Sequence, residues 1–168
     1  MDFKNIIGVV ENSSEYKEFI HKNPHYYLVH VFTTVDFEVV DNSLWQIGYY
    51  SPDTDKIVVF ENNNDMIFIH PPTEALKKEE YIQKLDLDKL KISREEGMKI
   101  CNDALKEKYP KELFSKAICL LQNLPEFGNV WNITIVTLAL GVINIKIDAI
   151  NGKVIKHTKE NLMNWKSE

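Results

Sequence analysis

The chain has 168 residues, a net charge of -5, and a composition of 44% hydrophobic and 27% charged residues. This composition is typical of a folded protein, because enough apolar surface is available to offset the chain entropy lost on folding. No stripe of clustered Lys and Arg is present, so nucleic acid is not an expected partner. The apolar run from Ile6 to Val10 is too short for a signal sequence or a membrane span, which predicts a cytoplasmic protein without a membrane span.

The first part of the chain predicts a short helix followed by four strands. Ser13 can cap a helix over residues 13–21, and Pro24 prevents that helix from continuing. Aromatic and β-branched residues then predict strands over 26–32, 44–50, 56–61 and 66–70. The turn-forming residues 51–55 should fold the second and third of these strands into a hairpin.

The middle of the chain predicts helices. Residues 73–85 have a charged face and an apolar minority, which favours a connecting helix. Ser93 and Glu96 have the spacing of a capping box, so a second helix should begin at residue 93. After Pro110, a further helix is expected over 110–121, and residues 122–129 are expected to form a loop. The apolar stripe of the helix expected over 110–121 would consist of Leu113, Phe114, Ala117, Ile118 and Leu121.

The final third predicts a β region. Residues 130–137 and 143–148 alternate between apolar and polar side chains, as half-buried strands do. Asn151 and Gly152 favour a type I′ turn, so residues 153–157 should return antiparallel to the preceding strand. The tail up to Trp165 is expected to form a short helix.

Together these elements predict an α+β fold of two similar units, each with a helix packed on an antiparallel β-sheet. The N-terminal α+β unit would span residues 1–72, a helical connector 73–90, and the C-terminal α+β unit 91–168. The segments beginning at Lys56 and Lys153 lie 97 residues apart and favour an internal repeat. The alternative is that two unrelated hairpins happen to share this order of elements.

Two motifs in the second half resemble PepSY domains. The segment Ile92-Ser93-Arg94-Glu95-Glu96 through Cys101 resembles their helix opening, and Ile145 through Ile155 resembles their closing hairpin. The resemblance covers about residues 90–158, and a degenerate tandem copy would occupy the N-terminal half. It implies a PepSY/cystatin-like fold and, by similarity to the propeptides of secreted metallopeptidases, binding and inhibition of a peptidase.

Metal sites are not expected from the histidines, acids or cysteines. His21 and His25 have helical ligand spacing, but Pro24 interrupts the helix between them. Asp53 and Asp55 lack the glycine and distal glutamate of a calcium loop, so turn capping is the better interpretation. The remaining groups favour isolated structural roles. These are His30, His70 and His157 in expected strands, and Cys101 and Cys119 as buried free thiols.

Catalytic and cofactor residues are not assigned either. The sequence contains no Gly-x-Ser-x-Gly turn and no clustered glycines that could cradle a nucleotide. The acidic pairs Glu95/Glu96 and Asp86/Asp88 are interpreted as solvated charges. Trp45 and Trp131 are interpreted as core residues, and no cofactor is expected. The residues of a binding site stay unassigned.

The favoured function is non-catalytic binding of a protein or peptide, with modulation of a peptidase as its finer form. A sheet edge, or the face of the sheet opposite the helices, would carry this function. One alternative is a small-molecule binder or enzyme that uses a curved sheet, suggested by the aromatic residues over 26–32 and 44–50. Another is a structural subunit that forms a homodimer.

Overall fold

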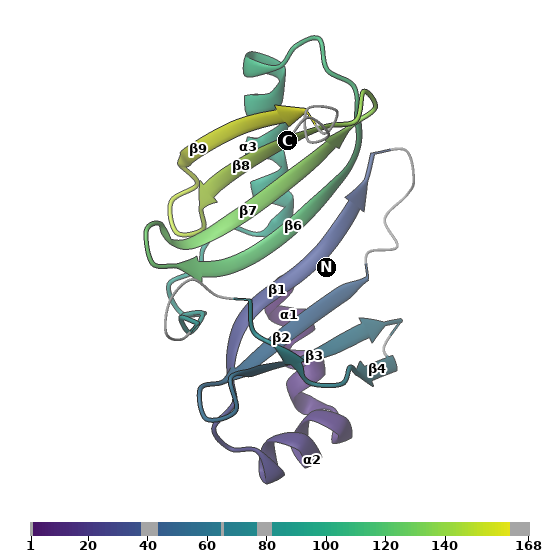
Figure 1. Ribbon diagram of the computed structural model, residues 1–168, viewed down its shortest axis with the longest axis vertical. Helices are drawn as coiled ribbons and strands as arrows, with labels where there is room; N and C mark the ends of the chain where they lie inside the picture. The colour runs from purple at the N-terminus through teal and green to yellow at the C-terminus, as the bar shows by residue number, and fades with distance from the viewer. Residues whose placement is uncertain (1, 38–43, 65, 77–81, 162–168) are drawn as a thin grey trace, which may run out of the picture.

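The computed structural model describes residues 2–37, 44–64, 66–76 and 82–161 (Figure 1). In these residues, nine strands form one antiparallel sheet with the order β4-β3-β2-β1-β6-β7-β8-β9, and β5 pairs with β3 beside β4. The strands are β1 Tyr27–Asp36, β2 Trp45–Ser51, β3 Lys56–Asn63, β4 Met66–Ile69, β5 Thr73–Glu74, β6 Phe114–Leu124, β7 Gly128–Thr137, β8 Gly141–Asp148 and β9 Val154–Asn161.

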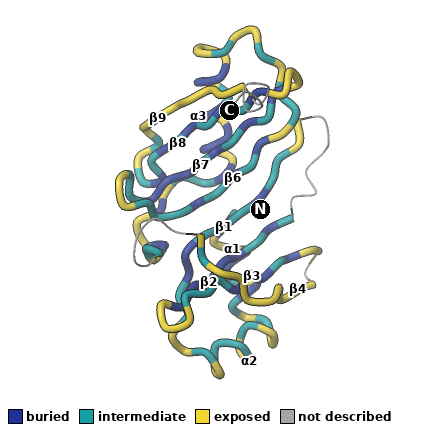
Figure 2. The backbone as a smooth tube through the Cα atoms, in the orientation of Figure 1, coloured by how far each residue is buried: buried dark blue, intermediate teal, exposed yellow. Residues whose placement is uncertain are grey.

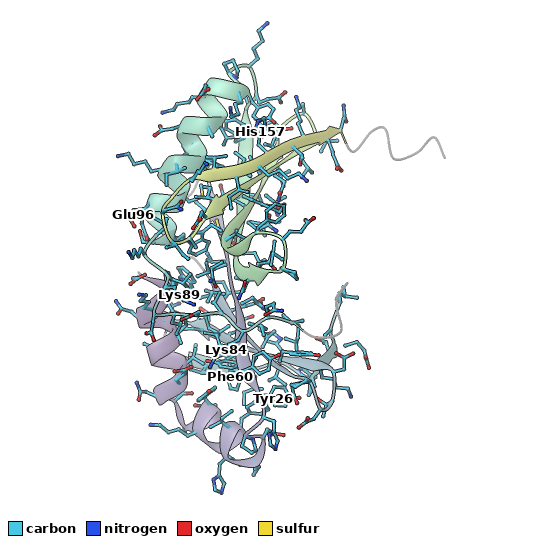
Figure 3. All side chains as sticks on the ribbon, turned by 90° about the vertical axis from the view of Figure 1, so that its left-hand side faces the viewer. Tyr26, Phe60, Lys84, Lys89, Glu96 and His157 are labelled. Atoms are coloured by element: carbon cyan, nitrogen blue, oxygen red, sulfur yellow. The ribbon has the colours of Figure 1, made fainter. Side chains whose placement is uncertain are left out.

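Three helices in the described residues lie on one face of this sheet. They are α1 Phe3–Asn12, α2 Ser14–Lys22 and α3 Arg94–Lys108. Helix α1 contacts β2 and β3, α2 contacts β4, and α3 contacts β7 and β8. Figure 3 shows the helices on one side of the strands, and we call the opposite side of the sheet the open face.

The prediction of two helix-on-sheet units is wrong, because one continuous sheet runs through both halves of the chain. Strand β1 pairs with β6 from His30 opposite Gln122 to Asp36 opposite Lys116. Helices and strands are both present, as an α+β fold requires. Strands dominate, however, and the two halves do not form separate sheets.

The prediction of a helix over residues 110–121 is also wrong, because most of this segment is a strand of the continuous sheet. Residues 114–124 form β6, which lies between β1 and β7 in the sheet. Ala117, Cys119 and Leu121 alternate toward the helix side and are fully buried. The predicted loop over 122–129 is correspondingly short, since β6 continues to Leu124 and β7 begins at Gly128.

The helical connector is not found in the described part of residues 73–90. Thr73 and Glu74 form β5, and residues 82–92 have no regular helix. Leu85 is buried, and its backbone N–H donates to the carbonyl of Leu28 at 3.0 Å. The Lys91 and Ile92 N–H groups both donate to the carbonyl of Ala149. These apolar and backbone contacts anchor the segment across the molecule, which overrides its moderate helix propensity.

Several predicted elements are confirmed. Ser13 caps α2 through its hydroxyl, which accepts from the Tyr16 N–H at 3.1 Å. The capping box of Ser93 and Glu96 begins α3, and the strands predicted in the first and last parts of the chain are present as β1 to β4 and β7 to β9. Helix α1 was not predicted. The tail helix expected up to Trp165 falls outside the described residues.

The loop between β8 and β9 is a hairpin, but not through the predicted type I′ turn. Gly152 has a φ of 77°, whereas Asn151 is not among the residues with positive φ. The carboxylate of Asp148 accepts from the N–H groups of Ile150 at 2.7 Å and Asn151 at 3.3 Å. Asp148 therefore organises a longer loop, in which its own carbonyl accepts from Gly152 N–H at 2.9 Å.

Candidate functional site

The two outer edges of the sheet carry different side chains. Strand β9 is exposed along most of its length and carries Lys156, His157, Lys159 and Glu160, charged or ionisable groups that discourage pairing with another strand (Figure 2). Strand β4 reads Met-Ile-Phe-Ile and forms the other edge. Met66, Phe68 and Ile69 are 58%, 47% and 45% exposed. Strand β4 itself carries no charged side chain, unlike β9, whereas Pro71, Pro72 and the exposed Glu74 of β5 follow it along the same edge.

The backbone of β4 leaves alternate peptide groups available at this edge. The N–H of His70 donates inward to the carbonyl of Val59 at 2.9 Å. In an antiparallel pair, inward and outward groups alternate along the strand. Phe68 therefore shares the inward direction of His70, whereas the N–H and C=O groups of Ile67 and Ile69 point away from β3. An added strand would form its hydrogen bonds with these two residues.

A groove runs between β4 and the first two helices. Its volume is about 1020 Å³, and we call it the α1–β4 groove. Asn5, Gly8, Val9 and Asn12 line it from α1, and Met66, Ile67 and Phe68 line it from β4. Val9 is 37% exposed and gives the helix wall an apolar surface. The rest of that wall is mostly polar, since Lys4, Ser13, Ser14 and Glu15 also line the groove.

Gly8 keeps the α1 wall of this groove open. A Cβ atom built on Gly8 would have no heavy atom within 4 Å. The glycine is therefore not required by close packing inside the molecule, although it lowers helix stability relative to alanine. Its absence of a side chain leaves space in the groove.

The histidines considered as ligands lie in separate places. His25 Nδ1 lies 4.0 Å from a carboxylate oxygen of Asp53, and both side chains are exposed. His70 Nε2 lies 2.9 Å from Glu61 Oε2, and hydrogen bonds from Gln46 and His70 lower the pKa of Glu61. His157 Nδ1 lies 2.8 Å from Tyr109 Oη, which links β9 to the end of α3.

His30 lies on the open face, where its ring occupies the space above Gly48. A Cβ atom on Gly48 would lie 2.0 Å from His30 Cε1. Burial lowers the pKa of His30 to about 4, so the imidazole is neutral at pH 7. The ring therefore packs as an uncharged group between β1 and β2. In the described residues no group of three or more His, Cys, Asp or Glu side chains could hold a metal ion.

The two cysteines are buried and free, as predicted, although Cys119 lies in β6 and not in a helix. Cys119 Sγ lies 3.6 Å from Met98 Sδ. Burial raises the pKa of each thiol to about 12. Both groups are therefore protonated at neutral pH, which makes them poor nucleophiles.

Trp45 and Trp131 are core residues, as predicted. Trp131 is fully buried and its indole N–H donates to the carbonyl of Ile92 at 2.9 Å. Trp45 is buried beneath the guanidinium of Arg94, whose Cζ lies 5.2 Å from the ring centroid. Arg94 was not singled out in the sequence, because the first residue of a charged helix is normally exposed.

The acidic residues have capping or surface roles. Glu96 accepts from the backbone of Ser93, which lowers the pKa of its carboxyl. Lys89 lowers the pKa of Asp86 through an exposed ion pair at 2.9 Å. Asp55 has a φ of 54° in the turn between β2 and β3 and accepts from Tyr50 Oη at 2.8 Å, in agreement with a turn role.

No family model matches the chain, and no curated protein matches it in sequence. The fold is similar to that of a crystal structure described as a "putative lipoprotein" from Clostridium difficile 630. The two share 18% sequence identity with a TM-score of 0.55, over 87% of this chain and 90% of the other. At this identity the likeness concerns the fold alone. Among the described residues, no helix is long and apolar enough to cross a membrane.

The sequence predicted β4 as a strand but did not identify its edge as a site. Its apolar composition was readable, and Pro71 and Pro72 directly after it are a signal that the strand lies at an edge. The other wall of the groove comes from α1, which the sequence analysis missed. The groove therefore could not be assembled from the predicted elements.

Proposed function

We propose that this protein is a non-catalytic module that binds an extended segment of a protein partner by adding it as a strand to β4. The observation that carries the proposal is the apolar edge strand at residues 66–69, which carries no charged side chain and lies beside the α1–β4 groove. Strand addition uses main-chain hydrogen bonds for affinity and side-chain pockets for selectivity.

The side chains of a bound strand would alternate between two environments. Those on the helix side would enter the α1–β4 groove, where Gly8 leaves space and Val9 provides apolar surface. Those on the open side would contact Met66 and Phe68, which are exposed there. The open side favours apolar residues, whereas the groove combines Val9 with polar side chains. The proposed partner segment is therefore extended, with β-branched or aromatic residues at the alternate positions that contact Met66 and Phe68.

The energy of such binding would come from both backbone and apolar contacts. Each hydrogen bond contributes about 1 kcal/mol net, and burial contributes about 25 cal/mol per Å² of apolar surface. A four-residue strand offers two outward residues, Ile67 and Ile69. Affinity therefore depends on the groove as well as on the edge. Filling the groove or removing an outward N–H donor from β4 should each weaken binding.

The test uses peptides selected from a random display library against the full-length protein. We expect the selected peptides to carry apolar residues at alternate or consecutive positions and no proline in the bound segment. Their affinity is then measured for two variants. Ile69→Pro removes an outward N–H donor, and Gly8→Gln places a side chain in the groove.

Each variant should reduce peptide affinity at least about tenfold. Ile69→Pro loses a main-chain hydrogen bond to the peptide, and Gly8→Gln loses part of the contact in the groove. The matched control is Val154→Pro at the start of β9, the opposite edge of the sheet, which should leave affinity unchanged. The proposal fails if no peptide is selected, or if selected peptides bind Ile69→Pro and Gly8→Gln as tightly as the unchanged protein.

Modulation of a peptidase is the finer form of this proposal. It rests on the resemblance of about residues 90–158 to PepSY domains, which stays a prediction. Its test is inhibition of metallopeptidases from the native host by the purified protein. Inhibition that is lost in Ile69→Pro would show that the protein inhibits the peptidase through strand addition at β4. Peptide binding without inhibition would support strand addition and contradict peptidase modulation. The cytoplasmic location and the homodimer also stay predictions.

A further inference from the structure

A second group of polar side chains lies on the open face, on β7 and β8. Asn144 Nδ2 donates to Asn132 Oδ1 at 2.7 Å and to Thr134 Oγ1 at 3.0 Å. Lys146 Nζ donates to Asn144 Oδ1 at 2.6 Å. These four side chains are partly buried, and three hydrogen bonds connect them into one network.

The ammonium group of Lys146 sets the direction of every hydrogen bond in this network. An ammonium group can only donate, so the Asn144 oxygen must face Lys146. The Asn144 amide nitrogen must then donate, and the side-chain oxygen of Asn132 must accept. The Thr134 hydroxyl oxygen likewise accepts, which leaves its O–H free to donate elsewhere.

The side-chain oxygens of Asn132, Thr134 and Asn144 therefore all accept hydrogen bonds within the network, whereas some of its N–H and O–H donors have no partner in it. The Asn132 amide nitrogen and the Thr134 hydroxyl donate to no other group in the described residues. Lys146 keeps further N–H donors, and Lys156 lies directly opposite it on β9. The Phe127 ring lies near both ammonium groups, with centroid distances of 5.9 and 6.0 Å. The cluster therefore presents hydrogen-bond donors and two positive charges to its surroundings.

Two like charges directly opposite each other on neighbouring strands repel. Partial burial and the charge of Lys156 lower the pKa of Lys146, and the carboxylate of Glu126 acts in the opposite direction. Glu126 is exposed, and the described residues show no ion pair between it and Lys146. An oxyanion bound between the two lysines would relieve this repulsion.

Apolar side chains continue the same rows toward the centre of the sheet. Leu120 lies opposite Asn132, and Ile118 lies opposite Thr134, on the neighbouring strand β6. Phe32 lies opposite Leu120 on β1. All three are partly exposed, so apolar surface adjoins the donor cluster on one side.

We propose that Asn132, Thr134, Lys146 and Lys156 bind the carboxylate or phosphate group of a small amphiphilic ligand, whose apolar part lies on Leu120 and Ile118. This site does not depend on the strand-addition function, since it lies on β6 to β9 and the α1–β4 groove lies at the opposite end of the sheet. Donors that converge on an anion and an adjacent apolar floor are the features of such a site.

The test is an NMR titration of the full-length protein at low ionic strength, since salt screens exposed charges. The probes are octanoate below its micelle concentration, acetate, and inorganic phosphate. We expect saturable shifts of the side-chain amides of Asn132 and Asn144 with each probe. Octanoate should bind at least about tenfold more tightly than acetate, because its chain buries apolar surface. Phosphate binding without this chain-length effect would overturn the amphiphile part of the proposal.

Lys146→Met and Lys156→Met should each weaken octanoate binding about tenfold or more, as loss of a charged hydrogen bond requires. The matched control is Lys116→Met, which removes a lysine from the same strand as Ile118 but outside the donor cluster. Equal binding by Lys146→Met and Lys116→Met would overturn the proposal, as would shifts confined to residues outside β6 to β9. Gly8→Gln should bind octanoate normally whether or not strand addition at β4 is correct.

Discussion

The ring of Phe3 in α1 packs edge-on against Trp131 in β7, with centroids 5.9 Å apart and an interplanar angle of 77°. This contact joins the first helix to a strand from the other half of the chain. Lys4, the next residue, donates from Nζ to the carbonyl of Leu90 at 3.0 Å. The first turn of α1 therefore lies at the junction of the two halves, and the hydrophobic core is continuous across it.

Phe3→Ala should lower the free energy of unfolding by about 3–5 kcal/mol, because it removes a fully buried ring and leaves a cavity beside Trp131. Denaturant unfolding followed by tryptophan fluorescence and by far-UV circular dichroism measures this loss. Both signals should show one coincident transition, since the halves share a core. Val9→Ala on the exposed side of α1 is the control and should cost much less. Separate transitions for the two signals would contradict a shared core.

Gly8→Ala should raise the free energy of unfolding by about 0.5–1 kcal/mol, since alanine favours the helix and the added methyl group has space. Thermal unfolding measures the gain. This prediction separates stability from binding, because Gly8→Gln should also fold well while it occupies the groove. A loss of stability in Gly8→Ala would show that the space over Gly8 is filled in solution.

Gly48→Ala should destabilise the protein by about 1–3 kcal/mol, because the new methyl group would overlap the ring of His30. The ring is a side chain and can turn away, so the cost is that of displacing it. His30→Ala combined with Gly48→Ala should cost less than the sum of the single changes. Chemical unfolding of all three variants forms a double-mutant cycle, and strict additivity would contradict this contact.

Stability should fall on acidification through His30. Its folded-state pKa of about 4 lies below its ordinary value of 6.5. The unfolded state therefore binds the proton more strongly, so the stabilising contribution is complete above pH 6.5 and is lost as the pH falls toward 4. The loss should reach about 3 kcal/mol, since one pKa unit corresponds to about 1.4 kcal/mol. Unfolding experiments over this pH range should show a shallower slope in His30→Gln, and an unchanged slope would contradict the assignment to His30.

The strand predictions succeeded where local alternation is strong, and they failed where tertiary pairing decides. Phe114, Ala117, Ile118 and Leu121 have a spacing that fits a helix, yet the same segment places Ala117, Cys119 and Leu121 on one face of a strand. Pairing with β1 and β7 selects the strand, and neither partner is visible in the local sequence. This single error also hid the joining of the two halves.

The candidate sites depended on relationships that are not local in sequence. Asn132, Thr134, Asn144 and Lys146 were recognised as polar positions of two alternating strands, but the hydrogen bonds among them follow from the register of β7 against β8. The β4 edge follows from strand order, and α1 lacks a side-chain cap that would have marked its start. The sequence therefore showed which residue types are present, but it did not show which residues lie next to one another in the fold.

Amide hydrogen exchange in the presence of a selected peptide tests the strand-addition proposal most directly. The N–H groups of Ile67 and Ile69 should become protected, because these groups point outward from the sheet. The His70 N–H is already bonded to Val59 and should change little. Peptide binding that leaves Ile67 and Ile69 unprotected, or that protects β9 instead, would contradict strand addition at β4.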